Sequence, residues 1–206
     1  MKDAEIGRGA EAVVIRTAFL GRDAVTKTRA RKGYRHPDLD QHLISSRTRT
    51  EVRVMREARS AGVRSPVVYD ADMKEGSITM EYIRGDSVKD ILDQHPERAD
   101  GICREIGKMI AKLHNHNISH GDLTTSNMIM DDDGNICLID FSLGDTRVDL
   151  EAMGVDLHLM ERAFTSAHSG IDNAFSEIIN GYREDMPSAD KVLERVEDIK
   201  SRARYT

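Results

Sequence analysis

The chain has 206 residues, of which 39% are hydrophobic and 32% are charged, a composition typical of globular rather than disordered proteins. No stretch approaches the roughly 20 apolar residues that span a bilayer, and the first ten residues lack the apolar core of a signal peptide. Cys103 and Cys137 form no CxxC pair, so we expect neither a disulfide framework nor a zinc site, and we predict a cytoplasmic protein.

The net charge of −6 is unevenly distributed along the chain. Between Lys27 and Arg64, eleven Lys and Arg residues outnumber four acidic residues, which gives this segment a charge of +7. Such a basic segment indicates either an anionic partner, such as nucleic acid, or a solvated helix face. Charge alone does not choose between these two interpretations.

The first 83 residues carry mainly strand patterns. Apolar runs at residues 12–15 and 24–26 flank a turn at 20–23, which predicts a β-hairpin. Two further strands are predicted at 66–69 and 77–80.

A long helix is predicted between these pairs of strands, from about Ile44 to Ala61, and Gly62 is expected to end it. Val54 and Ala58 are four residues apart, so we expect both on its buried side.

Helical patterns dominate after Gly85, and everything from about Val155 onward is predicted to be helical. Residues 128–130 and 136–139 predict a short hairpin within this half. We therefore predict an α+β protein with a strand-rich lobe at 1–83, a helical lobe at 84–206 and a hinge near 81–85. Helical spacing of apolar residues predicts one buried stripe, made of Ile102, Ile106, Met109, Ile110 and Leu113.

The strongest chemical signal is HGDLTTSN at residues 120–127, followed by Asp140. The predicted hairpin turns the chain back, so Asn127 and Asp140 can face one point. Because Mg²⁺ prefers hard oxygen ligands, we predict that Asn127 and Asp140 bind this metal. Asp122 is predicted to orient a hydroxyl or water and to accept its proton. A polar turn before a hairpin is the alternative, which the combined spacing disfavours.

A second set of residues is predicted to contact the nucleotide. Residues 6–13 resemble a glycine-rich loop between strands, in which glycine lets the backbone approach phosphates, although Ala12 replaces the third glycine. Lys27 ends the second strand and is expected to touch the phosphates, with Glu51 as its partner 24 residues later. The predicted nucleotide-contacting residues are Ile6, Gly7, Arg8, Gly9, Ala10, Glu11, Ala12, Val13, Val14 and Lys27, with Glu81 and Ile83 at the adenine.

These motifs together are similar to those of protein kinases, in which an Asn follows the catalytic-loop Asp by five residues and a metal-binding Asp follows. The resemblance implies a minimal, two-lobed protein-kinase-like fold that uses ATP and Mg²⁺. Three positions depart from the pattern: Gly121 replaces Arg, Thr124 replaces Lys, and Ser142 replaces the last Gly of DFG. No APE-like segment follows, which favours ATP hydrolysis, autophosphorylation or a restricted substrate.

Two longer motifs, RKGYRHPDLD at 31–40 and HGDLTTSNMI at 120–129, resemble the small atypical kinase/ATPase subunit of the KEOPS (EKC) complex, which is related to the PRPK kinases. This resemblance implies an ATPase and weak serine/threonine kinase that supports threonylcarbamoyladenosine (t6A) modification of tRNA. It implies catalytic and metal roles for Asp122, Asn127 and Asp140, an ion pair between Lys27 and Glu51, and a helical Asp that braces the catalytic loop, Asp156.

The same resemblance implies two partners, the threonylcarbamoyltransferase (Kae-type) subunit and a small regulatory subunit of KEOPS. No membrane association is expected. We expect tRNA to bind through basic residues of the first lobe, namely Arg29, Arg31, Lys32, Arg35, Arg47, Arg49 and Arg53.

Three alternatives remain open: a free-standing RIO-like protein kinase, a small-molecule phosphotransferase of the aminoglycoside or choline type, and a non-catalytic pseudokinase scaffold. His114, His116 and His120 lie close together, but their spacing disfavours a metal site. His120 is instead expected to support the catalytic loop by hydrogen bonding.

Overall fold

The structure is a computed structural model that describes residues 4–8, 11–171 and 173–203. These residues form two compact units, the first within 1–56 and 66–83 and the second within 57–65 and 84–206. The first unit holds the large sheet and the second holds most helices, which confirms the predicted α+β class. Among the described residues, no helix is both long and apolar enough to cross a membrane.

The first unit contains a five-stranded antiparallel sheet with the strand order β1-β2-β3-β5-β4. The predicted hairpin is confirmed, and its turn at Leu20 and Gly21 has positive φ at both residues, as a two-residue hairpin turn requires. The strands are β1 (Ala4–Arg8), β2 (Ala12–Phe19), β3 (Arg22–Arg29), β4 (Val68–Asp72) and β5 (Ser77–Glu81).

Helix α1 (Pro37–Ser60) begins seven residues before the predicted start. Pro37 occupies its first position, where the missing N–H has no helical partner to lose. Val54 and Ala58 are fully buried, as predicted. The predicted first lobe contained the whole helix, whereas residues 57–60 belong to the second unit.

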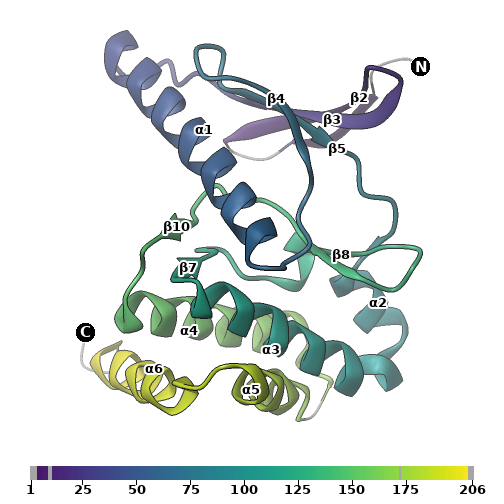
Figure 1. The fold of residues 1–206 in the computed structure, drawn as a ribbon, viewed down its shortest axis with the longest axis vertical. Helices are drawn as coiled ribbons and strands as arrows, with labels where there is room; N and C mark the ends of the chain where they lie inside the picture. The colour runs from purple at the N-terminus through teal and green to yellow at the C-terminus, as the bar shows by residue number, and fades with distance from the viewer. Residues whose placement is uncertain (1–3, 9–10, 172, 204–206) are drawn as a thin grey trace. The chain divides into compact units, whose positions relative to one another are not determined.

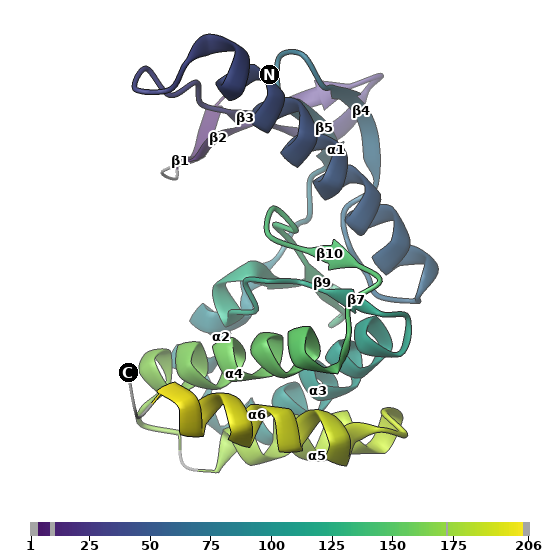
Figure 2. The same ribbon diagram turned by 90° about the vertical axis from the view of Figure 1, so that its left-hand side faces the viewer.

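The second unit is built on helices α3 (Ala99–Asn115) and α4 (Leu150–Ala167). Helices α5 (Ala174–Asp185) and α6 (Ala189–Ala203) lie on one side of them, and the short strands lie on the other (Figures 1 and 2). Helix α4 starts five residues before the predicted boundary because Asp149 caps it by accepting the N–H of Ala152. The predicted buried stripe of α3 is confirmed at all five residues, Ile102, Ile106, Met109, Ile110 and Leu113.

Two glycines allow α3 and α5 to pack closely. A Cβ atom on Gly107 would lie 2.0 Å from the carbonyl oxygen of Ile178, and one on Gly181 would lie 2.0 Å from that of Arg104. No larger residue fits at either position without moving a helix. The close approach of α3 and α5 therefore depends on Gly107 and Gly181.

The predicted short hairpin is confirmed as β8 (Met128–Met130) and β9 (Ile136–Leu138). The backbone N–H of Ile139 donates to the carbonyl oxygen of Asn127 at 2.9 Å, so the hairpin brings Asn127 beside the residue that precedes Asp140. The remaining elements are α2 (Val88–Gln94), the strands β6 (Asp86–Ser87), β7 (Ile118–Ser119) and β10 (Asp145–Thr146), and the 3₁₀ helices η1 (Pro96–Arg98) and η2 (Thr125–Asn127).

Candidate active site

The first unit contains the predicted ion pair between Lys27 and Glu51. The Lys27 Nζ atom lies 2.8 Å from Glu51 Oε1, and both side chains are buried, with exposed fractions of 6% and 1%. Lys27 stands on β3 and Glu51 on α1. A buried charge without a partner strongly destabilises a protein, and here Lys27 and Glu51 compensate each other.

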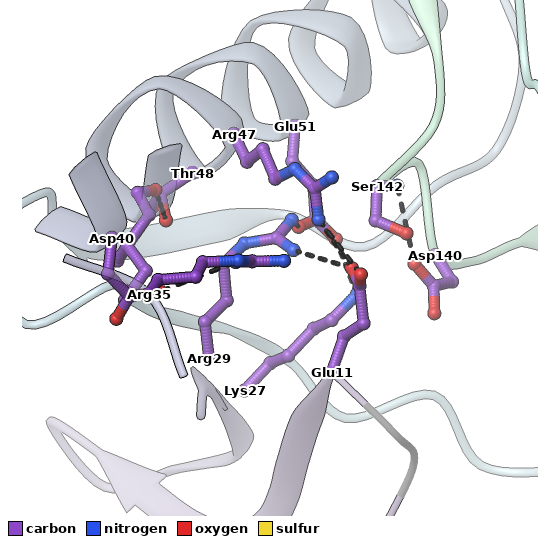
Figure 3. A network of polar contacts seen from close by, with 11 residues as sticks. Glu11, Lys27, Arg29, Arg35, Asp40, Arg47, Thr48, Glu51, Asp140 and Ser142 are labelled. Carbon is purple, nitrogen blue, oxygen red and sulfur yellow. Dashed lines mark hydrogen bonds and ion pairs between the residues drawn. The ribbon is translucent and has the colours of Figure 1, made fainter. Parts of the chain in front are cut away.

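Arg29 shares the same glutamate. Its NH2 atom donates to Glu51 Oε2 at 2.5 Å, and its NH1 atom lies 3.9 Å from Glu11 Oε2. Arg47 in turn donates to both oxygens of Glu11, at 2.9 and 2.8 Å (Figure 3). Five charged side chains thus alternate in sign through the first unit. The sequence interpretation missed this network, although the Lys-x-Arg and Arg-x-x-x-Glu spacings place these residues on common faces.

The predicted RNA-binding patch needs correction at Arg29. Its exposed fraction is only 7%, because residues two apart on a strand share a face and Lys27 occupies the buried face of β3. Arg35 pairs with Asp40 at 3.3 Å, and Arg47 pairs with Glu11. The exposed members of the predicted patch are Arg31, Arg49 and Arg53, and Lys32 is half-buried.

The predicted glycine-rich segment lies largely in two paired strands. Ile6, Gly7 and Arg8 belong to β1, while residues 12–14 belong to β2. Glu11 lies just before β2, and the predicted contacts Gly9 and Ala10 fall outside the described residues.

The predicted adenine contacts lie at the end of β5. The backbone N–H of Glu81 donates to the carbonyl oxygen of Val67 at 2.8 Å, and Glu81 Oε2 accepts the N–H of Val67. Ile83 is buried, with an exposed fraction of 7%. Nucleotide contact by Glu81 and Ile83 stays a prediction.

In the second unit, Asn127 and Asp122 are joined directly. The Asn127 Nδ2 atom donates to the backbone oxygen and to Oδ2 of Asp122, each at 2.9 Å. The 3₁₀ helix η2 positions Asn127, and Thr124 Oγ1 caps it by accepting the N–H of Asn127. With Nδ2 engaged by Asp122, the amide oxygen Oδ1 is the atom of Asn127 that could bind a cation.

Asp140 adopts an unusual backbone conformation with φ of 60°. Its Oδ1 atom accepts the N–H of Ser142 at 3.3 Å (Figure 3). Left-handed conformations are uncommon for residues other than glycine and often occur at functional sites. An amide oxygen of Asn127 and a carboxylate of Asp140 are the donor types that Mg²⁺ prefers.

Asp156 holds the backbone of the catalytic loop. Its carboxylate accepts the N–H groups of His120 and Gly121, both at 2.8 Å, and lies 3.4 Å from His114 Nε2. Burial opposes ionisation of Asp156, but the hydrogen bonds from His114 and from the loop backbone outweigh it, so the pKa of Asp156 lies below its ordinary value. The bracing role that the resemblance implied for Asp156 is confirmed.

Gly121 occupies a position where no side chain fits. Its φ is +79°, and a Cβ atom would lie 2.2 Å from the carbonyl oxygen of Leu143. The arginine that protein kinases usually carry here is therefore excluded by the backbone. Beside it, His120 accepts the N–H of Asp122 and contacts the carbonyl oxygen of Ile139 at 3.0 Å, which confirms the predicted support of the loop by His120.

A second support of the loop was not predicted from the sequence. His168 follows α4 and is buried, and its Nε2 atom lies 2.8 Å from Thr125 Oγ1. Asp93 Oδ1 lies 3.4 Å from His168 Nδ1, without hydrogen-bond geometry. Burial lowers the pKa of His168 despite this carboxylate. No sequence spacing links positions 93, 125 and 168, so only the fold reveals this cluster.

Comparison with known proteins identifies the family. A RIO domain matches residues 13–164. The KEOPS complex subunit Bud32 of Pyrococcus abyssi is 42% identical over 186 residues, which cover 88% of this chain and 84% of that protein. The chain belongs to the Bud32 family of RIO-domain proteins. The EKC/KEOPS complex subunit bud32 of Dictyostelium discoideum is 35% identical over 97% of this chain and 82% of that protein.

Other Bud32-like sequences are parts of longer proteins. A probable bifunctional tRNA threonylcarbamoyladenosine biosynthesis protein of Methanospirillum hungatei is 43% identical over 98% of this chain, but the chain covers only 36% of that protein. The chain thus spans about a third of the length of the bifunctional relatives that it matches. Membership of the Bud32 family confirms the KEOPS resemblance seen in the sequence motifs.

Proposed function

We propose that this chain is an ATP-dependent phosphotransferase, with ATPase and serine/threonine kinase activity, that supports t6A modification of tRNA as a KEOPS subunit. The observation that carries the proposal is the paired hydrogen bond from Asn127 to Asp122, in a loop that Asp156 holds by two backbone N–H groups. The names of the Bud32-family relatives support the process and the complex.

The proposed roles follow from the chemistry of each side chain. Asp122 is exposed and accepts the proton of an attacking hydroxyl or water, while Asn127 keeps its carboxylate in place. Asn127 Oδ1 and Asp140 would hold Mg²⁺, which with ATP supplies charge neutralisation at the phosphates. Lys27 would donate to phosphate oxygens, and Glu51 fixes the direction of its ammonium group.

The proposed partners are the threonylcarbamoyltransferase subunit, a small regulatory subunit and tRNA, and the proposed compartment is the cytoplasm. The exposed side chains of Arg31, Arg49 and Arg53 are the best supported RNA contacts of the first unit. Contacts to phosphate make binding strongly salt-dependent. Recovery of the transferase in a pull-down from the native cell, read by mass spectrometry, tests the partnership.

A direct experiment tests the catalytic part of the proposal. Purified protein with Mg²⁺ and ATP should release phosphate, and Asp122→Ala should abolish the release. Asp132→Ala serves as the matched control, because Asp132 is an exposed carboxylate in the turn between β8 and β9. Full turnover in Asp122→Ala would show that another group accepts the proton.

A free-standing protein kinase is the second candidate, because the matched domain is a RIO domain. Labelled phosphate transferred from ATP to several unrelated proteins, in the absence of any partner subunit, would favour this candidate. Phosphate release that rises only when the transferase subunit is added would favour the first.

A further inference from the structure

Two elements of the first unit present charged side chains to each other. Lys27 and Arg29 are two residues apart and so lie on the same face of β3. Arg47 and Glu51 lie about one turn apart on α1. The sheet register pairs Ala12 with Arg29, and the N–H of Ala30 donates to the carbonyl oxygen of Glu11 at 2.9 Å. The fold thus brings Glu11 beside Arg29.

The resulting order of charges is Lys27, Glu51, Arg29, Glu11 and Arg47, three cations and two carboxylates. The guanidinium of Arg47 lowers the pKa of Glu11 through its hydrogen bond, so Glu11 is ionised at neutral pH.

Arg29 has a specific position in this order. Arg29 donates a hydrogen bond to Oε2 of Glu51, whereas Lys27 donates to Oε1 of the same carboxylate. Arg29 Nε is buried and has no hydrogen-bond partner among the residues that the structure describes. The guanidinium is thus held by the carboxylates on its two sides, one on α1 and the other in the glycine-rich segment.

We propose that Arg29, Glu11 and Arg47 are positioning residues that fasten the glycine-rich segment to the Lys27–Glu51 pair and so set the affinity for ATP. The inference rests on the proposed function and deepens it. Under this proposal, Arg29 and Arg47 support the ATP site indirectly and do not bind RNA as predicted from the sequence. Glu11 and Arg47 are partly exposed, at 48% and 38%, so removing their charges should leave the fold intact.

The experiment measures steady-state phosphate release as a function of ATP concentration for Glu11→Gln, Arg47→Gln and the double variant. Because exposed ion pairs are weak, each single change should raise KM for ATP about threefold with kcat and Tm unchanged. The double variant should raise KM no further than Glu11→Gln alone, because Glu11→Gln already removes the contacts of Glu11 with both Arg47 and Arg29. Arg29→Lys should also raise KM, since lysine lacks the planar fork that reaches two carboxylates.

Arg104→Gln is the matched control, because Arg104 forms a similar exposed pair with Glu177 in the second unit. If the fold-increases in KM caused by Glu11→Gln and Arg47→Gln multiplied in the double variant, the linkage would be overturned. KM values equal to that of Arg104→Gln would overturn it as well. Weaker tRNA binding by Arg47→Gln at unchanged KM would overturn it as well.

Lys27→Met separates this inference from the proposed function. Loss of turnover in Lys27→Met, with no KM change in the linkage variants, would overturn the linkage and leave the proposed function standing. Full turnover in Lys27→Met would instead contradict the proposed function itself.

Discussion

The side-chain amide of Asn127 donates to both the backbone oxygen and the carboxylate of Asp122, each at 2.9 Å. One residue thereby holds the proposed proton acceptor at two points and leaves its own amide oxygen for a cation. The position of Asp122 and the proposed metal binding are thus coupled in a single side chain.

Asn127→Ala should therefore impair turnover in two ways. Removing a preorganised hydrogen-bond donor from an active site lowers kcat by about a hundredfold. The Mg²⁺ concentration for half-maximal phosphate release should rise as well, because one oxygen ligand is lost. Ser126→Ala, an exposed neighbour, is the control. An unchanged Mg²⁺ requirement would remove Asn127 from the set of metal ligands.

Asp156→Asn should destabilise the protein by about 3 kcal/mol, because it leaves buried donors facing a neutral group. The pKa of Asp156 is below its ordinary value of 3.8, so the folded protein binds fewer protons at this site than the unfolded chain. Its contribution is complete above the unfolded value and is lost as pH falls toward the folded pKa. Urea unfolding from pH 7 to pH 3 should show a steeper acid loss in the native protein than in Asp156→Asn. Parallel curves would contradict this.

Gly121→Ala should be far more damaging than Gly134→Ala. Both glycines have positive φ, +79° and +83°, but only at Gly121 does a Cβ atom meet backbone, at 2.2 Å from Leu143 O. Gly134→Ala should cost about 1 kcal/mol, the usual price of a left-handed alanine. Gly121→Ala should lower the free energy of unfolding by more than this. It should also reduce phosphate release, because the loop at residues 120–127 must move to admit the methyl group. Thermal unfolding and phosphate release should be measured for both variants. Equal losses of stability in Gly121→Ala and Gly134→Ala would contradict the predicted clash.

Thr125→Val tests the support of the loop by His168. Valine has nearly the same shape but no hydroxyl, so the buried His168 Nε2 atom loses its partner at 2.8 Å. An unsatisfied buried group costs about 1–3 kcal/mol. We expect a lower Tm and slower phosphate release, because Thr125 starts the 3₁₀ helix that positions Asn127. Thr146→Val, in the short strand β10, is the control for the substitution itself. Unchanged turnover with a lower Tm would limit His168 to stability.

Local patterns were sufficient for the type of the main helices and strands and for locating the motif at residues 120–140. The buried stripe of α3, the hairpin at 128–138 and the glycine at 121 are each encoded within a few consecutive residues. The predicted starts of α1 and α4 were seven and five residues too late, because the first turns of α1 are largely polar and because the Asp149 cap starts α4 at Leu150.

Sequence alone thus determined the α+β class, because local spacing sets which side chains share a face, and the resemblance to protein kinases pointed to the motif from Asp122 to Asp140 and to the Lys27–Glu51 pair. Only the tertiary structure decided that Arg29 is buried between two carboxylates and that His168 reaches Thr125. Those contacts join residues from separate elements, and the path of the backbone between them, not any local period, sets their distance.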